Sequence, residues 1–185
     1  MTRLGVGRST HQVNDASSLA VSKVNQSYPD FVRFLNRYLL AMIRDIPDSD
    51  ERATYACDFV WSSICINQNL ECRQHRDKNN DDISAIIALD HFSGGDLRYW
   101  EEDLGPAGCS VNDLPDHVST TLPLRRKLQF FDGNRAHQTA PFTGRRTTIT
   151  WYTVRHAWGD GPYRESAELL GFRLPTPTHR TQPHA

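Results

Sequence analysis

RTTITWYTV, at residues 146–154, is the stretch of this chain that most directly predicts its fold. It is rich in β-branched and aromatic residues, which favour β-strands. Side chains alternate between the two faces of a strand, so Arg146 and Thr148 share one face while Thr147 and Ile149 share the other. The stretch therefore predicts a strand that brings an arginine and a hydroxyl group to the same face of a sheet.

Strand-like segments continue on the N-terminal side of this stretch. Residues 60–69 alternate in character, and residues 83–89 form a short, almost wholly apolar run, as in a strand that is buried on both faces. Gly94-Gly95 marks a turn, and further strands are expected at residues 96–100, 118–122 and 127–131. Six or more short strands, separated by turns and preceded by a helix, predict a mainly β fold with supporting helices, a jelly roll.

The chain is expected to divide into three regions. Residues 1–26 are polar and aperiodic and predict a loop, residues 27–172 predict a single domain, and residues 173–185 predict a disordered tail. The jelly roll should occupy about residues 54–158 of that domain, with a long aperiodic insertion at residues 101–117.

Two helices are expected beside the jelly roll. The first, at residues 27–45, begins with Ser27 as its cap, and the second is a short helix at residues 164–170. Apolar residues at helical spacing predict which face of the first helix packs on the domain: Phe31, Phe34, Leu35, Tyr38, Leu39, Met42 and Ile43.

Composition is that of one globular domain. The chain has 185 residues, of which 38% are hydrophobic, and it can bury one sizeable core. Its net charge of −1 provides no overall attraction to nucleic acid, so a nucleic-acid substrate would depend on local basic patches. The candidate patches are residues 125–127, Arg145, and the group of Arg73, Arg76 and Lys78.

Cysteine usage and hydropathy bear on the compartment. The four cysteines have no CxxC spacing and no secretory signal precedes them, which predicts reduced thiols in a cytoplasmic or nuclear protein. No apolar run approaches the length of a membrane span. We expect a monomer that binds no membrane.

Two histidines and an aspartate upstream of the 146–154 stretch have the spacing of a metal site. His75 and Asp77 are two residues apart, so on an extended segment their side chains converge while Arg76 turns away. His137 follows about sixty residues later and can supply the third ligand. Two imidazoles and one carboxylate on one face of a metal are the ligand set of mononuclear iron(II) oxygenases, in which the remaining positions stay open.

Arg146 and Thr148 complete a second pattern. An inward guanidinium with a hydroxyl group two residues later suits a dicarboxylate, because the planar fork pairs with a carboxylate through two hydrogen bonds. The neighbouring Arg145 is a rival for this role, but the parity of the strand with Thr148 favours Arg146.

The combined pattern of His75, Asp77, His137, Arg146 and Thr148 resembles the Fe(II)/2-oxoglutarate-dependent dioxygenases. The resemblance implies a double-stranded β-helix in which the two histidines and the aspartate hold Fe(II) as the catalytic centre. It also implies that 2-oxoglutarate pairs its far carboxylate with the arginine and the threonine, and that O2 is the oxidant. Because a carboxylate stands at the second ligand position, the expected reaction is hydroxylation of a C–H bond rather than halogenation.

Within that superfamily, residues 60–155 look like the TET/JBP branch, which oxidises methyl groups on pyrimidine bases in DNA. The motifs that carry this resemblance are Asn67-Gln68-Asn69, Cys72, His75-Arg76-Asp77-x-x-Asn80, Ser84, Gly94-Gly95-Asp96-Leu97 and Phe131-Asp132-Gly133-Asn134. The resemblance implies that Asn80 hydrogen-bonds the flipped base.

The resemblance assigns two further positions. TET enzymes have a second base-contacting histidine after the arginine strand, where this chain has Val154, and His156 lies two residues further on with the same parity. Asn67 and Asn69 either line the mouth near 2-oxoglutarate or satisfy backbone groups.

Several substrate classes stay open at this point. They are a methylated base in DNA or RNA, a protein side chain as in prolyl hydroxylases, and a small molecule. A jelly-roll module that binds without catalysis is a further alternative.

Overall fold

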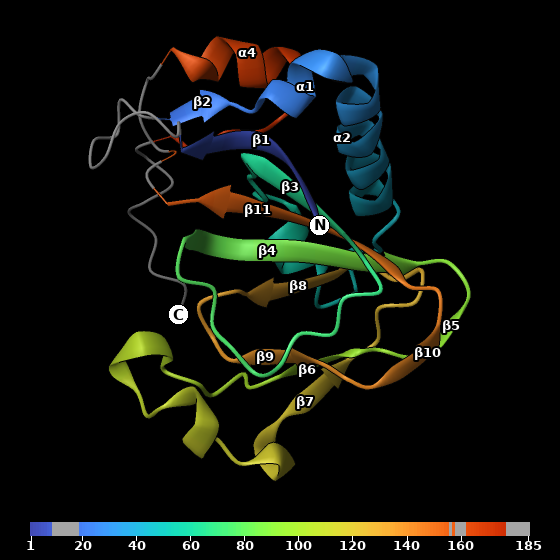
Figure 1. The fold of residues 1–185 in the computed structure, drawn as a ribbon, viewed down its shortest axis with the longest axis vertical. Coiled ribbons are helices and arrows are strands. Elements are labelled where there is room, and N and C mark those ends of the chain that lie inside the picture. The colour runs from blue at the N-terminus through green and yellow to red at the C-terminus, as the bar shows by residue number, and fades with distance from the viewer. Residues whose placement is uncertain (9–18, 156, 158–161, 177–185) are drawn as a thin grey trace. The chain divides into compact units, whose positions relative to one another are not determined.

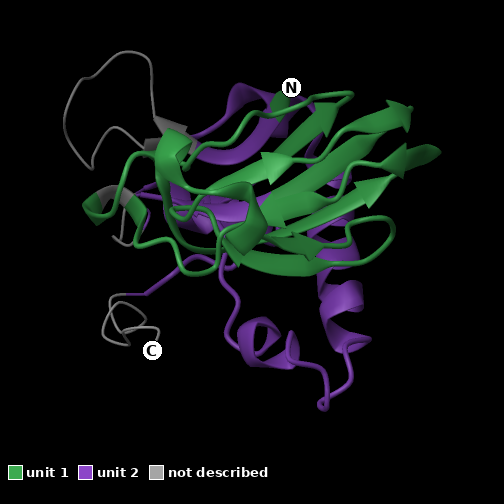
Figure 2. Cartoon of the chain, turned by 90° about the horizontal axis from the view of Figure 1, so that it is seen from below, with its two compact units in different colours: residues 1–2, 65–150 green, residues 3–64, 151–185 purple. Residues whose placement is uncertain are grey.

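The fold is seen in a computed structural model, which describes residues 1–8, 19–155, 157 and 162–176 (Figure 1). The chain forms two compact units (Figure 2). The first contains residues 1–2 and 65–150, and the second contains residues 3–64 and 151–185. Every predicted site residue except His156 belongs to the first unit.

Four neighbouring strands of one sheet contribute residues to the first unit. They follow the order β3 (Ser63–Gln68), β11 (Thr147–Val154), β4 (Asn80–Leu89) and β8 (Gln129–Asp132). β4 and β8 are antiparallel, with Ser84 opposite Phe131. The predicted apolar run lies in β4, where residues 84–88 are all buried.

Shorter strands form the second layer of this unit. β7 (Thr120–Leu122), β6 (Leu97–Tyr99) and β9 (His137–Thr139) pair antiparallel in that order. β5 (Phe92–Gly94) and β10 (Phe142–Gly144) form a separate pair. An isolated bridge joins His75 to His137, so the segment around His75 extends the β9 edge.

The order of the strands along the chain defines the fold class. Successive segments alternate between the two sheets: β3, the His75 segment, β4, β6 with β7, β8, β9 and β11. This alternation of antiparallel strands is that of a jelly roll. The prediction of a mainly β fold with supporting helices is confirmed. The buried cluster at its centre comprises Ile86, Ala88, Phe92, Leu97, Tyr99, Leu124 and Phe131.

The insertion after β6 is irregular but folded. It contains three short 3-10 helices, η2 (Gly105–Ala107), η3 (Val111–Asp113) and η4 (Asp116–Val118). Trp100, at its start, is 1% exposed and donates from Nε1 to the Pro115 carbonyl oxygen at 2.9 Å. The long aperiodic segment is therefore held against its own strand layer.

The second unit begins with strands where the sequence predicted a loop. β1 (Thr2–Arg8) pairs with β2 (Leu19–Val21), and α1 (Lys23–Ser27) follows. The prediction for residues 1–26 is thus wrong for these elements. The side chain of Asn25 is fully buried and exchanges two hydrogen bonds with the backbone of Gly5, at 3.0 and 3.1 Å. That long-range pairing stabilises a segment too short and polar to show periodicity.

The long helix α2 (Pro29–Arg44) lies within the predicted residues 27–45, but its buried face differs from the predicted one. Leu35 and Leu39 are buried, whereas Phe31 and Phe34 are 48% and 60% exposed. Val32 and Asn36 take their places on the buried face.

Asn36 is tolerated there because both its oxygen and its nitrogen are hydrogen-bonded. Its Oδ1 accepts from Trp61 Nε1, and its Nδ2 donates to the Leu170 carbonyl oxygen, both at 2.8 Å. The predicted cap was also wrong: Ser27 lies in α1, and Tyr28 precedes α2 without a side-chain cap bond.

The remaining elements of this unit are α3 (Ala53–Ala56) and α4 (Tyr163–Leu169), and α4 is close to the predicted residues 164–170. The predicted disordered tail is wrong for residues 173–176. The Trp61 N–H donates to the Arg173 carbonyl oxygen at 2.7 Å, and Leu174 is buried. Residues 177–185 lie outside the described part of the chain.

Two expectations from composition concern the whole chain. All four cysteines are described and none forms a disulfide. Among the described residues, no helix combines the length and the apolar character that crossing a membrane requires.

Candidate metal centre

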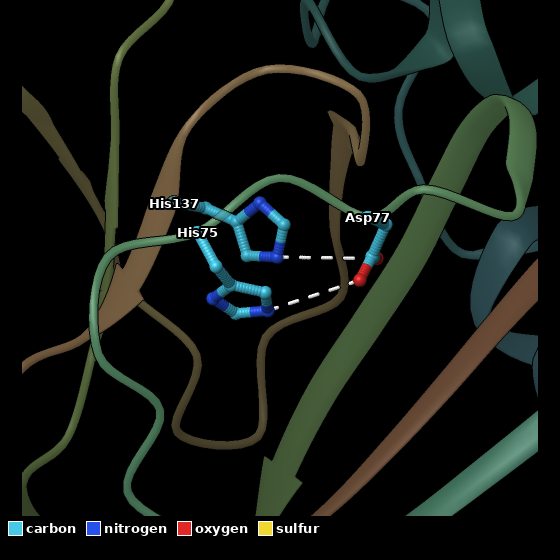
Figure 3. Close-up of side chains that lie close together, drawn as sticks. All are labelled: His75, Asp77 and His137. Carbon is cyan, nitrogen blue, oxygen red and sulfur yellow. Dashed lines mark ion pairs between the residues drawn. The ribbon is translucent and has the colours of Figure 1, made fainter. Parts of the chain in front are cut away.

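His75, Asp77 and His137 converge in the first unit (Figure 3). One ligand atom from each lies within 4.8 Å of the others. His75 Nε2 is 3.8 Å from Asp77 Oδ1, and His137 Nε2 is 3.9 Å from Asp77 Oδ2. Each imidazole thus faces a different oxygen of one carboxylate, and the three donors surround one small volume. Nitrogen and carboxylate donors in this number suit a first-row transition metal.

Backbone pairing brings the three residues together. The His75 N–H donates to the His137 carbonyl oxygen at 3.0 Å, and the His137 N–H returns a bond to His75 at 2.9 Å. The Asp77 N–H donates to the Gly133 carbonyl oxygen at 2.8 Å. Because His75 and Asp77 are two residues apart on an extended segment, both side chains point to the same side.

The two histidines present the same ring nitrogen to the centre. His75 Nδ1 lies 2.7 Å from the Arg73 carbonyl oxygen, and His137 Nδ1 lies 2.9 Å from the Arg135 carbonyl oxygen. A carbonyl oxygen only accepts, so Nδ1 carries the proton in each ring and Nε2 keeps its lone pair. Metal-binding histidines are commonly oriented by a hydrogen bond of this kind.

Burial keeps one of the imidazoles neutral. Desolvation lowers the pKa of His137 below its usual value, and the nearby His75 lowers it further, although the Asp77 carboxylate acts in the opposite direction. His137 is 6% exposed. The side chains of His75 and Asp77 are 40% and 33% exposed, so the centre is open on their side.

Asn80, the predicted base-binding residue, lies beside the carboxylate. Its Nδ2 donates to Asp77 Oδ2 at 2.8 Å, and the residue is 8% exposed. The amide therefore orients the oxygen that faces His137. A base-contacting role for Asn80 stays a prediction.

Gly133 leaves room for this hydrogen bond. A Cβ at position 133 would lie 3.0 Å from Asp77 Oδ2 and 3.2 Å from Asn80 Nδ2.

We expect Gly133→Ala to weaken Mn(II) binding by about tenfold, because displacing an outer partner of a metal ligand typically costs ten- to a hundredfold. Isothermal titration with Mn(II) measures this. Unchanged Mn(II) affinity in Gly133→Ala would show that the Asp77–Asn80 geometry does not control the metal.

Arg145 and Arg146 lie in opposite environments, as the strand parity predicted. Arg146 is 3% exposed and precedes β11, whereas the side chain of Arg145 is 64% exposed and pairs with Asp90 at 3.3 Å. Thr147 Oγ1 donates to the same Asp90 at 2.6 Å. Thr148, two residues after Arg146, is 4% exposed. The arginine and the threonine that the sequence predicted for a dicarboxylate are therefore both buried.

The surroundings of Arg146 are apolar on two sides. Its guanidinium lies over the rings of Phe92 and Phe142, with 5.8 and 5.4 Å to the ring centres. Its Nε is buried and has no hydrogen-bond partner among the described residues. Burial lowers the pKa of Arg146, and the proximity of Cys72 and Asp96 offsets this in part.

Gly95 allows this placement of the guanidinium. Its φ is +75°, and a Cβ at this position would approach Cδ and Nε of Arg146 to 2.9 Å. The Gly94-Gly95 turn that the sequence predicted therefore also clears space for the buried cation.

The other predicted residues are placed less tightly. Asn67 is half-buried, with its Oδ1 3.6 Å from Cys65 Sγ. Asn69, rather than Asn67, serves the backbone, because its Oδ1 accepts from the Arg146 N–H at 2.9 Å. His156 lies outside the described residues. The role of Asn67 at 2-oxoglutarate stays a prediction.

Comparisons with known proteins add little to this geometry. No family model and no curated protein matches the chain. Among solved structures, it is similar to a prolyl-4-hydroxylase from Pseudomonas putida, with a TM-score of 0.38 and 16% identity over 69% of this chain and 82% of that chain.

Proposed function

We propose that this chain is an Fe(II)- and 2-oxoglutarate-dependent dioxygenase that hydroxylates a C–H bond. The observation that carries the proposal is the convergence of His75, Asp77 and His137 around one small volume. Two imidazoles and a carboxylate leave metal positions open for a co-substrate and O2. The bound iron would supply the redox chemistry that couples decarboxylation of 2-oxoglutarate to hydroxylation.

Arg146 supports 2-oxoglutarate as the co-substrate. A buried guanidinium with an unpartnered nitrogen is costly unless an anion completes it. A carboxylate fits its planar fork, and the apolar walls formed by Phe92 and Phe142 strengthen that pairing by excluding water. Thr148, on the same strand face, is proposed as the hydroxyl contact, and Asn67 as a residue at the mouth.

Metal and co-substrate binding test the proposal directly. Protein purified without chelator should bind one Fe(II), or one Mn(II) as a surrogate, per chain. 2-Oxoglutarate should bind only when the metal is present, and aerobic incubation with Fe(II) should release succinate. A chain that binds neither metal nor 2-oxoglutarate would instead be a jelly-roll binding module.

For the substrate, we propose the methyl group of a modified pyrimidine in DNA, such as 5-methylcytosine. The resemblance of the sequence to the TET/JBP branch supports this class, and so does the position of Asn80 next to the ligand Asp77. His156 is proposed as a second base contact. In the candidate basic patch of Arg73, Arg76 and Lys78, Arg73 and Lys78 are exposed and are proposed to contact phosphates. Arg76 is not proposed to contact phosphate, because its guanidinium is paired with Asp103.

Three described aromatic residues that could stack on a base, Phe92, Tyr99 and Trp100, do not offer it an exposed surface. Phe92, Tyr99 and Trp100 are 5%, 8% and 1% exposed and belong to the interior. Base recognition is therefore assigned to hydrogen bonding by Asn80. An amide can donate to and accept from a pyrimidine edge.

Asn80→Ala separates base reading from support of the metal. We expect it to lower oxidation of 5-methylcytosine oligonucleotides by about ten- to a hundredfold, because hydrogen bonds to a base are worth about 1–3 kcal/mol. Succinate release without product should fall less, so the ratio of oxidised base to succinate, measured by mass spectrometry, should drop. A proportional fall of both would mean that Asn80 acts only through Asp77.

A different substrate would have a distinct outcome. If methylated single- and double-stranded DNA yields no oxidised base while a peptide or a small-molecule pool is hydroxylated, the nucleic-acid proposal is wrong. The dioxygenase proposal would survive that result, because it depends on the metal and 2-oxoglutarate residues alone.

A further inference from the structure

A buried carboxylate in the insertion binds the middle residue of the His75–Asp77 motif. Asp103, which follows β6, has a side chain that is only 1% exposed. Its two oxygens accept from one guanidinium: Arg76 Nε donates to Oδ2 at 2.7 Å, and Arg76 Nη2 donates to Oδ1 at 2.5 Å. Arg76 also donates to the Cys109 carbonyl oxygen at 3.0 Å. Arg76 and Asp103 therefore form a bidentate ion pair, which is largely buried and is also hydrogen-bonded to the insertion.

The same carboxylate reaches the segment that carries the third ligand. The Ala136 N–H donates to Asp103 Oδ2 at 2.6 Å, and Ala136 immediately precedes His137. The Gly105 N–H donates to Oδ1 at 3.2 Å. One side chain thus binds the residue between two ligands and the residue before the third.

Strand alternation explains why this arrangement leaves the metal volume open. Arg76 points to the side opposite His75 and Asp77, because successive side chains of an extended segment alternate. Asp103 therefore binds the ligand-bearing segment on the side opposite the volume that His75 and Asp77 face.

The contacts of Asp103 keep it charged. Burial alone would raise the pKa of this carboxyl group, but the bonds from Arg76 and from the Ala136 N–H outweigh burial and bring the pKa below its usual value. The Asp103 carboxylate is therefore ionised at neutral pH.

We propose that Asp103 is a positioning residue for the metal centre, which sets the spacing of the His75–Asp77 segment and His137 by binding Arg76 and the Ala136 N–H together. The insertion at residues 101–117, which carries Asp103, then helps to set the geometry of the metal ligands. This inference rests on the proposed function, because it presumes that the three residues hold a metal.

Mn(II) titration followed by electron paramagnetic resonance tests the inference without using activity. Asp103→Asn should weaken Mn(II) binding by about tenfold, the lower end of the cost of losing a direct partner of a metal ligand, because Asp103 contacts the residues next to the ligands. It should also change the visible spectrum of the Co(II)-loaded protein, which reports ligand geometry. Glu102→Gln is the matched control: it removes an exposed charge from the neighbouring residue and should leave Mn(II) affinity within about twofold.

A double variant distinguishes positioning from general stability. In Arg76→Met/Asp103→Leu, apolar side chains of similar size replace the buried ion pair, and such replacements often preserve folding. We expect this variant to melt close to the wild type yet bind Mn(II) as weakly as Asp103→Asn, with an altered Co(II) spectrum.

Two results would overturn the inference. One is wild-type Mn(II) affinity in Asp103→Asn, and the other is recovery of that affinity together with stability in the double variant. Failure of the wild type itself to bind Mn(II) would contradict the proposed function instead.

Discussion

Replacing Asp77 with alanine is expected to abolish succinate formation and to leave too little metal affinity for stoichiometric Mn(II) binding. Asp77 supplies the only carboxylate among the three clustered ligand residues, and each of its oxygens faces a different imidazole. Loss of a direct ligand should exceed the ten- to hundredfold cost that is typical of losing an outer partner. Titration with Mn(II) and mass spectrometry of succinate measure both effects.

The control for Asp77→Ala is an exposed aspartate of the same unit that is not among the three clustered ligand residues. Asp113 is exposed in the 3-10 helix η3, and Asp113→Ala should retain both metal binding and turnover. The thermal midpoint of metal-free Asp77→Ala should stay close to that of the metal-free wild type, since Asp77 is one-third exposed. Normal succinate release by Asp77→Ala would contradict the assignment of the ligand set.

Substitution of Arg146 by lysine is expected to weaken 2-oxoglutarate binding by about ten- to a hundredfold. Lysine keeps the positive charge but loses the planar fork, and one hydrogen bond to a charged group is worth about 1.5–3 kcal/mol. Each 1.4 kcal/mol corresponds to a tenfold change in affinity. The dissociation constant of 2-oxoglutarate, measured anaerobically on Mn(II)-loaded protein, should rise while Mn(II) affinity stays the same.

Arg145→Lys is the matched control because it makes the same change at the adjacent residue. Arg145 is exposed and pairs with Asp90 at the surface, where an ion pair contributes little. We expect its 2-oxoglutarate dissociation constant to stay within about twofold of the wild type. Equal effects of the two substitutions would mean that the buried guanidinium does not receive the co-substrate.

The fold class and the identity of the candidate ligands followed from local rules. Alternation along residues 146–154 assigned Arg146 and Arg145 to opposite faces, and one is buried while the other is exposed. The two-residue spacing of His75 and Asp77 likewise placed both side chains on one side. Such features depend on a repeat of two residues and on the chemistry of the ligands, which are both present in the sequence itself.

Periodicity was less informative where it was short or imperfect. In the part of β1 whose burial is described, Leu4 and Val6 are the buried apolar residues and flank Gly5, a pattern too short to indicate a strand. In α2, the apolar stripe predicted Phe31 at the interface, but the helix buries Asn36 instead, because Trp61 and Leu170 satisfy its amide. A polar residue with partners distant in sequence cannot be recognised as buried from local pattern.

What the sequence by itself determined is the mainly β fold, the set of candidate metal ligands and the parity of the arginine strand. Only the tertiary structure decided what the side chains beside those ligands bind. Arg76 was a surface cation by sequence and is a partner of Asp103, 27 residues away. Asp103 also binds the backbone of Ala136, 33 residues away. The physical reason is that a hydrogen bond acts over about 3 Å in space whatever the separation along the chain.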